Sequence, residues 1–249
     1  MRRLVLAQTL AAIIFAAAAS AQPATDSGAP PRQPDPGAAA VRRPALVTTQ
    51  DALAWGGGLA VAAVLDATIR DFSQTKRSAT SNGVAGVGNA LGTAYTWGPA
   101  LVGTWLVGTL ARKQKVADAA LLAAASGAVT GGITAVLKAA IGRQRPPGGN
   151  AAAFDPFGGD TSFPSGHTSF AFAVASSLAH STPDGWSDVG LYAAATLTGL
   201  SRINHDRHWA TDVVAGAALG YFVGRQLRVG RGVATPIAVP GGVGFSLTF

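Results

Sequence analysis

The chain has 249 residues, of which 48% are hydrophobic and 12% charged, and its formal net charge is +7. This length and apolar content are enough for one sizeable core, so we expect a single main folded domain. The absence of cysteine excludes disulfides and thiolate metal sites, and the scattered cations, without a Lys/Arg tract and interleaved aromatics, argue against a nucleic-acid partner.

The first 21 residues have the composition of an export signal. Met1-Arg2-Arg3 precedes an apolar stretch that ends at Ala19, and Ala19-Ser20-Ala21 forms a small-x-small cleavage site. We predict a signal peptide over residues 1–21, cleaved after Ala21, and a periplasmic location. An uncleaved anchor helix is the alternative, although the apolar run is short for a membrane span.

Residues 22–50 are predicted to form a disordered tether. Six prolines lie among Ala, Gly and Gln in this segment, and such a composition cannot bury a core. The folded domain is therefore expected over residues 51–228.

Six helices are expected in this domain, separated by segments that contain Gly, Pro, Asn or clustered charge. Asp51 and Ser165 are the predicted N-caps of the first and fourth helices. Abundant Ala and Gly predict an all-α domain with closely approaching helices. The predicted helical ranges are 51–71, 85–111, 116–142, 166–181, 186–201 and 208–228.

The C-terminal tail, residues 229–249, has a different pattern. Two short apolar runs flank Pro240-Gly241-Gly242, which predicts a β-hairpin packed on the helical domain. A strand of an outer-membrane barrel, ending in Phe249, is the alternative, but one hairpin cannot close a barrel.

The first chemically informative motif is Lys138 followed, after six residues, by Arg145-Pro146. Gly142 and Pro146 end the helix that carries Lys138, so both cations are expected near one helix end. Arg145 can bind two phosphate oxygens and Lys138 supplies a point charge. Taken alone, the pair is also what complements a helix dipole.

The second motif is Pro164-Ser165-Gly166-His167, at the start of a long apolar helical pattern. Backbone N–H groups at a helix N-terminus face an anion, and Gly166 allows close approach. Ser165 can add a hydroxyl hydrogen bond, and His167 is placed to act on a bound phosphate ester. A structural serine N-cap with a first-turn histidine is the alternative.

The third motif is Ser201-Arg202, then His208 after five residues and Asp212 after three more. Asp212 lies one helical turn after His208, so its carboxylate can hold one ring nitrogen and leave the other free to attack. This is the orienting arrangement of a catalytic triad, applied to a histidine nucleophile. A surface His–Asp pair is the alternative for this motif alone.

Together the three motifs resemble the type 2 phosphatidic acid phosphatase (PAP2) superfamily, which includes lipid phosphatases, bacterial acid phosphatases and vanadium-dependent haloperoxidases. The resemblance covers roughly residues 51–228 and implies a six-helix bundle of that type. It also implies that the phosphate is bound by Lys138, Arg145, Ser165, Gly166 and Arg202.

The same resemblance implies the catalytic roles. His208 would attack phosphorus, Asp212 would orient it, and His167 would protonate the leaving oxygen before water hydrolyses the phosphohistidine. No metal or cofactor is expected, because three cations and a helix dipole offset the developing charge.

Two further features lie near these motifs. His205 falls inside the third motif but at none of its matching positions, so we favour a position on the loop over a role in the site. Phe154 and Phe157 lie in the glycine-rich segment 147–163, and we hypothesise that this segment forms a rim over the leaving group.

Location and substrate stay open at this point. Several predicted helices are too short or charged to span a membrane, which favours a soluble or peripherally attached periplasmic enzyme over an integral inner-membrane protein. The expected partner is a phosphorylated lipid or a small phosphate ester. A vanadate-dependent haloperoxidase that uses the same pocket is the competing activity, and a non-catalytic phosphate-binding protein is a third possibility.

Overall fold

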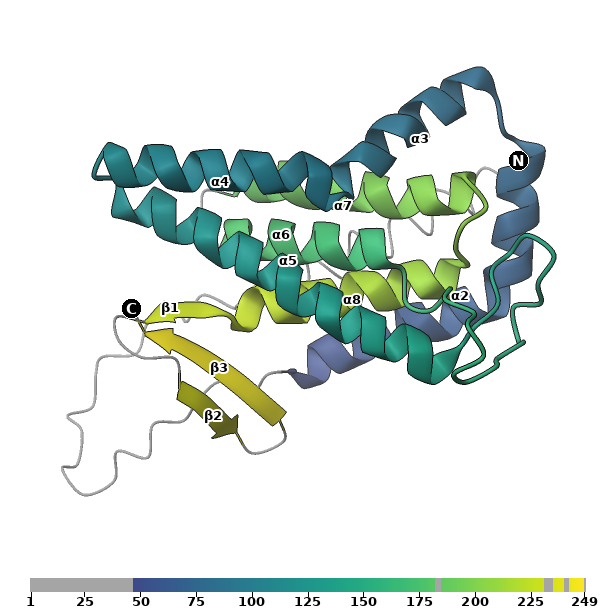
Figure 1. The fold of residues 1–249 in the computed structure, drawn as a ribbon. Helices are drawn as coiled ribbons and strands as arrows, with labels where there is room; N and C mark the ends of the chain where they lie inside the picture. The colour runs from purple at the N-terminus through teal and green to yellow at the C-terminus, as the bar shows by residue number, and fades with distance from the viewer. Residues whose placement is uncertain (1–46, 182–184, 231–234, 240–241, 249) are drawn as a thin grey trace, which may run out of the picture.

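The computed structural model describes residues 47–181, 185–230, 235–239 and 242–248, so the predicted signal peptide and most of the predicted tether lie outside it. The described residues form a helical bundle with a small sheet at one end (Figure 1). Its helices are α2 (Thr49–Thr75), α3 (Ala79–Leu91), α4 (Ala94–Leu110), α5 (Gln114–Ile141), α6 (Gly166–Ser181), α7 (Trp186–Asn204) and α8 (Ala210–Gln226).

The described chain therefore has seven helices, and the expected count of six is wrong. The predicted helix 85–111 is two helices, because Gly92 ends α3 and Thr93 caps α4 by accepting a hydrogen bond from the amide of Thr96 at 3.3 Å. A Cβ on Gly92 would lie 2.3 Å from Thr198 Cγ2 and 3.0 Å from His167 Cβ. The break thus lets the backbone pack directly on the helices that carry two of the motifs.

The first helix is longer than predicted and has a different cap. Thr48, rather than Asp51, is the N-cap residue of α2: its hydroxyl accepts from the Asp51 amide at 3.1 Å. The Asp51 carboxylate accepts in return from the Thr48 amide at 3.0 Å. This reciprocal pair is a capping box, which satisfies two amides that the helix itself cannot pair.

Helix α6 lies in the middle of the bundle and packs against α5, α7 and α8 (Figure 1). Its buried side chains join an apolar core that includes Trp55, Phe172 and Tyr221. The Trp55 and Tyr221 rings lie 5.6 Å apart, and Tyr192 from α7 lies 6.2 Å from Tyr221. The core thereby fixes α6 against both α2 and α8.

Glycines on α8 set its close approach to α6. A Cβ on Gly216 would lie 2.7 Å from the Ser165 carbonyl oxygen, and one on Gly220 would lie 2.2 Å from that of Ser169. Only a residue without a side chain permits this backbone contact. The small-residue packing expected from the sequence therefore holds the start of α6 beside the start of α8.

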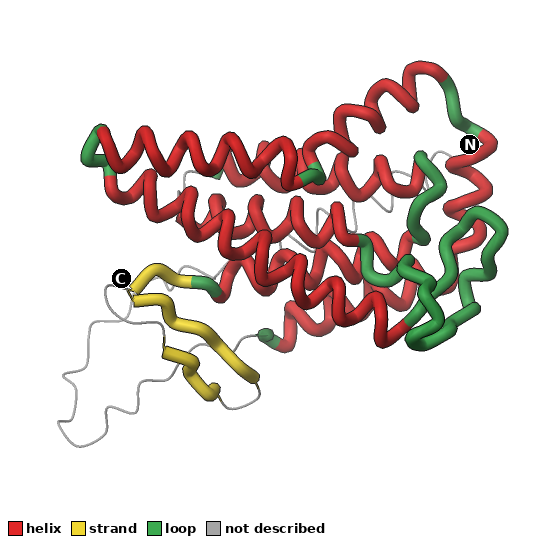
Figure 2. The backbone as a smooth tube through the Cα atoms, in the orientation of Figure 1, coloured by secondary structure: helices red, strands yellow, loops and turns green. Residues whose placement is uncertain are grey.

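The motif-bearing helix ends share one end of the bundle. The C-termini of α5 and α7 meet the N-termini of α6 and α8 there, and the long segment 142–165 folds over them (Figure 2). This arrangement follows from the antiparallel packing of consecutive helices. It brings all three motifs to a common region.

The described C-terminal residues form a three-stranded sheet, at the opposite end of α8 from the motifs (Figure 1). Its order is β1 (Arg228–Gly230), β3 (Gly242–Thr248), β2 (Thr235–Val239), with β2 antiparallel and β1 parallel to β3. The sequence prediction contained two strands and did not include β1.

Two of the described helices, α2 and α5, are long and apolar enough to cross a membrane, by length and composition alone. Core helices of soluble proteins often pass the same test, but here only 28% and 33% of the apolar windows are buried. Large apolar side chains are also exposed on α4, including Val107 at 65% and Leu110 at 76%. The outer surface of these helices is therefore unusually apolar.

Candidate active site

The three motifs converge on one another through direct contacts. The backbone amide of Ser165, in the second motif, donates to the carbonyl of Asp212 in the third at 2.9 Å. A Cβ on Gly166 would lie 3.8 Å from Lys138 Cε of the first motif. Residues that are more than 70 positions apart in the sequence thus form one site.

Lys138 and Arg145 are held by the same loop residue, Thr161. The Lys138 ammonium donates to the carbonyl oxygen of Thr161 and, at 3.3 Å, to that of Ser162. Arg145 Nη2 lies 3.3 Å from the Thr161 hydroxyl, to which it donates. Both cations are half-buried, and neutral oxygens position them without neutralising their charge.

Ser165 and His167 flank Gly166 at the start of α6. Ser165 is fully buried, and its hydroxyl lies 2.9 Å from that of Thr168. No atom lies closer than 3.7 Å to the position of a Gly166 Cβ, so this backbone is approachable from the side of Lys138. The helix N-terminus thereby presents amides beside the cations.

His208 and Asp212 are both buried, and His208 Nδ1 lies 3.4 Å from Asp212 Oδ2. The same carboxylate oxygen accepts from the Trp209 amide at 3.0 Å and from the Ser162 hydroxyl at 2.5 Å. Asp212 therefore faces Nδ1, and Nε2 of His208 is the ring nitrogen left for chemistry.

A buried arginine that the sequence analysis treated as a spacer completes the support of Asp212. Arg143 donates from Nη1 to Asp212 Oδ1 at 2.7 Å and from Nη2 to Asp66 Oδ2 at 2.6 Å. Asp66 on α2 also accepts from the amide and hydroxyl of Thr211 at 2.8 and 2.7 Å. Asp212 thus links His208 to a continuous buried chain, Asp66–Arg143–Asp212–His208.

The guanidinium of Arg143 is enclosed on all sides. Two of its nitrogens donate to the Ala151 carbonyl at 2.9 and 2.7 Å. Its central carbon lies 5.7 Å from the Trp209 ring centre and 5.6 Å from that of Phe154. Trp209 itself donates from Nε1 to the Gln144 carbonyl at 2.8 Å. The predicted rim residue Phe154 therefore covers Arg143, while Phe157 is 81% exposed.

The sequence held weak signals for these missed residues. Arg143 lies two positions before Arg145 within the first motif, and Asp66 is the single charge in the apolar stretch from Leu59 to Ile69. An isolated carboxylate on the buried face of a helix requires a partner. Nothing in the local sequence identifies that partner as Arg143.

Arg202 stands in contrast to Arg143, because no described carboxylate lies within ion-pair distance of it. Its Nη1 donates to the Asn89 side-chain oxygen, and its buried Nε has no hydrogen-bond partner. Arg202 is 8% exposed, so this donor is shielded from solvent. A buried unpaired donor of this kind fits a site that receives an anion.

Burial and the nearby cations keep both site histidines neutral. Burial lowers the pKa of His208 to about 4, against the opposing effect of Asp212. Burial, followed by the charges of Arg202, His208, Lys138 and Arg145, lowers the pKa of His167 to about 4. A neutral His208 has the free electron pair that a nucleophile needs.

Asp212 stays ionised because its neighbours outweigh the effect of burial. Burial acts to raise its pKa, but the hydrogen bond and charge of His208, the charge of Arg143 and the hydroxyl of Ser162 together lower it. An ionised Asp212 stabilises the positive charge that His208 acquires when it reacts.

The segment that carries the three motifs is similar to a known family. Residues 119–231 match the model of the PAP2 superfamily. This segment of the chain belongs to the PAP2 superfamily. Among curated proteins, a lipid A 1-phosphatase of Porphyromonas gingivalis is 41% identical to this chain over 114 residues. The match covers 45% of this chain and 22% of that protein, so the chain spans about a fifth of the relative's length.

One of two similar solved structures supports the fold. A transmembrane PAP2 type phosphatidylglycerolphosphate phosphatase from Bacillus subtilis superposes with a TM-score of 0.56 at 24% identity, over 69% of this chain and 90% of its own. Aquifex aeolicus LpxE gives a TM-score of 0.48 at 23% identity, over 64% of this chain and 92% of its own. The Bacillus subtilis likeness supports the helical PAP2 architecture expected from the motifs.

Proposed function

We propose that this PAP2 chain is a metal-independent phosphatase that hydrolyses phosphate esters through a phosphohistidine. One observation carries the proposal. A neutral histidine, oriented by a buried carboxylate, shares a site with three cations, Lys138, Arg145 and Arg202, and no described carboxylate lies within ion-pair distance of any of the three. A nucleophile beside unpaired cations is the arrangement that phosphoryl transfer requires.

In the proposed reaction, His208 Nε2 forms a bond to phosphorus while the P–O bond to the leaving group breaks. The leaving oxygen takes the electron pair of that bond and a proton from His167. A bound phosphate raises the proton affinity of His167, since its negative charge offsets the cations that lower it. Water then attacks the phosphohistidine, His167 accepts a proton from that water, and phosphate and neutral His208 are released.

Lys138, Arg145 and Arg202 would hold the phosphate oxygens, with Ser165 and the Gly166 amide at the helix N-terminus. Their positive charge offsets the negative charge that grows on the phosphoryl oxygens in the transition state. No metal is assigned a part, and in the portion of the chain that the structure describes no group of three metal-binding side chains is present.

We infer a lipid phosphate as the substrate class. The curated relative acts on lipid A and the Bacillus subtilis protein on phosphatidylglycerolphosphate, as their names state. In this chain an apolar pocket of about 400 Å³ begins beside Arg202, at its neighbours Ser201 and Ile203, and continues between α2, α3 and α7. Such a pocket suits the apolar part of a lipid next to the phosphate site.

The apolar surface of α2, α4 and α5 supports a membrane-associated enzyme rather than a freely soluble one. Location outside the cytoplasm follows from the predicted signal peptide, which lies outside the described residues. Carbonate washing of membranes from expressing cells tests the association. We expect the protein to stay in the pellet until detergent is added, and release by carbonate would contradict an integral position.

A vanadate-dependent haloperoxidase would use the same residues, but the family match and the relatives named above give that activity no support. The two functions separate in one experiment on the purified full chain. Hydrolysis of phosphatidic acid, phosphatidylglycerol phosphate and p-nitrophenyl phosphate is measured beside bromide oxidation with added vanadate. We expect hydrolysis only, and halide oxidation without hydrolysis would overturn the proposal.

His208→Ala is the matching variant, and His180→Ala is its control at the other end of α6. Loss of the nucleophile should lower kcat by about 10⁴-fold or more, while His180→Ala should keep the wild-type rate. Wild-type turnover by His208→Ala would show that another residue attacks.

A further inference from the structure

A pocket that we call the outer pocket lies beside Arg145 and Arg202, two of the proposed phosphate-binding residues. It has a volume of about 320 Å³ and is lined by Asn89, Arg145, Arg202, His205 and Arg207. Lys138, His167 and His208 do not line it. From Arg145 and Arg202 the pocket extends to Arg207. His205, which we expected on the loop rather than in the site, lines the outer pocket.

The outer pocket carries positive charge that no acidic group offsets. Three of its five lining residues are arginines, and among the described residues no carboxylate lies within ion-pair distance of any of them. Burial and the charges of Arg202, Arg77 and Arg207 lower the pKa of His205. The pocket is thus a place where cations repel one another until an anion enters.

The turn that lines this pocket also contains a carboxylate, Asp206, which binds an arginine outside the pocket. Asp206 lies between His205 and Arg207, but its two oxygens accept from Nε and Nη2 of Arg70 at 2.8 and 2.9 Å. The Arg207 amide donates to the Arg202 carbonyl at 3.0 Å, which closes the turn. Asp206 therefore neutralises Arg70 on α2, and the pocket side of the turn presents only His205 and Arg207.

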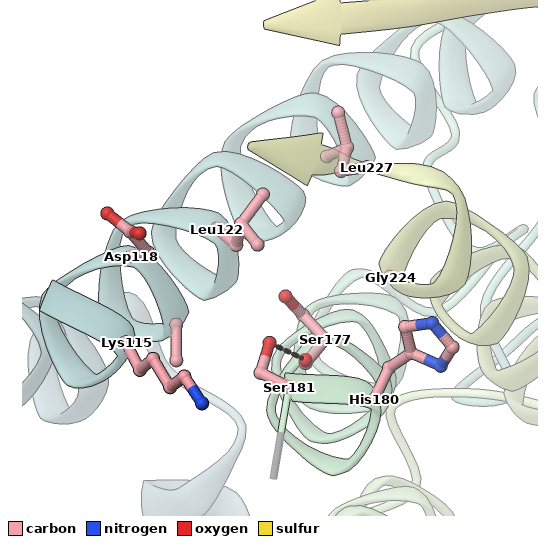
Figure 3. A pocket seen from close by; sticks show the side chains of 9 residues that line it. Lys115, Asp118, Leu122, Ser177, His180, Ser181, Gly224 and Leu227 are labelled. Carbon is pink, nitrogen blue, oxygen red and sulfur yellow. Dashed lines mark hydrogen bonds between the residues drawn. The ribbon is translucent and has the colours of Figure 1, made fainter. Parts of the chain in front are cut away.

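A pocket at the opposite end of the bundle differs from the outer pocket in the charges that line it. That pocket, of about 370 Å³, is also polar, but Asp118 lines it together with Lys115 and His180 (Figure 3). Lys115 and Asp118 lie three residues apart on α5, so the lining of this pocket carries charges of both signs. Charge is balanced there, whereas it accumulates in the outer pocket.

We propose that the outer pocket is a second phosphate subsite, in which Arg207 and His205 bind a phosphate group next to the one that His208 attacks. Arg202 lines the outer pocket, and its buried Nε, which has no hydrogen-bond partner among the described residues, can supply a donor. The ligand class is a diphosphate ester, or free phosphate that competes with it. The proposal rests on the proposed phosphatase function and adds a preference for diphosphates over monophosphates.

With a diphosphate ester, the terminal phosphoryl group would lie beside His208 and the ester-linked phosphate in the outer pocket. The His208–phosphorus bond forms as the bond from the terminal phosphorus to the bridging oxygen breaks. The bridging oxygen keeps the electron pair and takes the proton of His167, so a monophosphate ester leaves. Arg207 would stabilise the charge on that leaving group.

The kinetic test compares decyl phosphate with decyl diphosphate, which differ only in the second phosphate. Arg207→Gln should raise KM for the diphosphate about tenfold, because one charge-assisted contact is lost, and should change the monophosphate KM less than about twofold. Lys115→Gln removes the same charge at the other end of the bundle and should change neither value. Equal effects of Arg207→Gln on both substrates, or none on either, would overturn the subsite.

A binding measurement keeps the subsite testable apart from catalysis. Titration calorimetry compares methylenediphosphonate, which cannot be hydrolysed, with methylphosphonate. The wild-type protein should bind the diphosphonate more tightly, and Arg207→Gln should remove that preference. An absent preference in the wild type would refute the subsite even if the enzyme is active, whereas a preference without any hydrolysis would refute only the phosphatase function.

Inorganic phosphate distinguishes the two sources of the ligand. If free phosphate also uses the outer pocket, Arg207→Gln should weaken its inhibition of decyl diphosphate hydrolysis about tenfold, in parallel with KM. Unchanged inhibition beside a raised diphosphate KM would assign the subsite to the substrate alone.

Discussion

Arg143 and Arg145 are two residues apart in the same motif, yet they belong to opposite halves of the site. Arg143 is 4% exposed and joins two carboxylates at 2.6 and 2.7 Å. Arg145 is half-buried and donates to the hydroxyl of Thr161, and no carboxylate of the described residues lies within ion-pair distance of it. One arginine is part of a closed, charge-balanced wall behind His208, and the other faces the open, uncompensated side where a phosphate would enter.

The difference shows how one residue type performs two tasks. A buried charge is tolerated only when it is paired and its donors are satisfied, which is the situation of Arg143. A cation that lacks a counter-ion in a partly buried site is unfavourable until an anion binds, which is the situation of Arg145 and Arg202. The wall formed by Arg143 and its two carboxylates should therefore determine the stability of the protein and the orientation of His208. The open side with Arg145 and Arg202 should determine ligand binding.

Breaking the wall should have the largest effect on stability. Arg143→Met leaves Asp66 and Asp212 buried without a counter-ion and should lower the free energy of unfolding by about 3–5 kcal/mol. The control is Arg70→Met, which breaks the more exposed pair with Asp206 and should cost no more than about 1 kcal/mol. Denaturant unfolding in detergent measures both, and similar losses would contradict the distinction.

Breaking the open side should instead affect catalysis. Arg202→Gln should lower kcat/KM for a phosphate ester by about 10²–10³-fold, as for the loss of one donor to a transition state. Its melting temperature should not fall, since removing an uncompensated cation relieves repulsion. A large fall in melting temperature, with little change in kcat/KM, would assign Arg202 to the wall.

A larger side chain at the contact between α6 and α8 should disturb the buried Asp212 side of the site and leave the phosphate-binding cations in place. Gly216 lies one turn after Asp212, where a Cβ would meet the Ser165 carbonyl at 2.7 Å and the Ser169 hydroxyl at 3.0 Å. Gly216→Ala should cost about 1–3 kcal/mol and reduce kcat through displaced Asp212. Gly190→Ala on α7, where no atom lies within 4 Å of the added Cβ, should instead stabilise by up to about 1 kcal/mol. Equal changes in the free energy of unfolding for the two variants would contradict this prediction, since they would show that α6 and α8 can move apart without cost.

Acid should weaken the site through its histidines. His167 and His208 have pKa values of about 4 in the folded protein, below the value of about 6.5 for an unfolded histidine. The unfolded chain therefore binds more protons between these values, and the free energy of unfolding should decrease as pH falls from about 6.5 to about 4. Bound phosphate should reduce this decrease, because the anion raises both pKa values. Melting curves with and without phosphate test it, and identical pH dependence would be the contrary result.

The helices and the site could be predicted to different depths from the sequence. Periodicity and caps located most helices, because those signals are local. The break at Gly92-Thr93 was missed, because the close approach that requires a glycine at position 92 is to Thr198, more than 100 residues away. The cap of α2 was misplaced because Thr48 and Asp51 can both serve as capping residues, and only their reciprocal bonds decide between them.

The site shows the same division between local and distant information. Spacing placed His208 and Asp212 one helical turn apart, and family resemblance grouped them with Lys138 and Arg202. The ion pairs of Arg143 with Asp66 and Asp212 join residues 77 and 69 positions apart. No local pattern encodes such pairs, so the wall became visible only once the helices were packed.

Capture of the phosphohistidine tests the central claim most directly. The full-length protein is mixed with ³²P-labelled p-nitrophenyl phosphate, quenched in alkali after a single turnover, and digested. The label is expected on the peptide that contains His208 and should be absent from His208→Ala. In His167→Ala it should persist longer, because the base for hydrolysis is missing while the good leaving group needs no acid. Full turnover without any labelled protein, or a label on another residue, would contradict the assignment of His208 as the nucleophile.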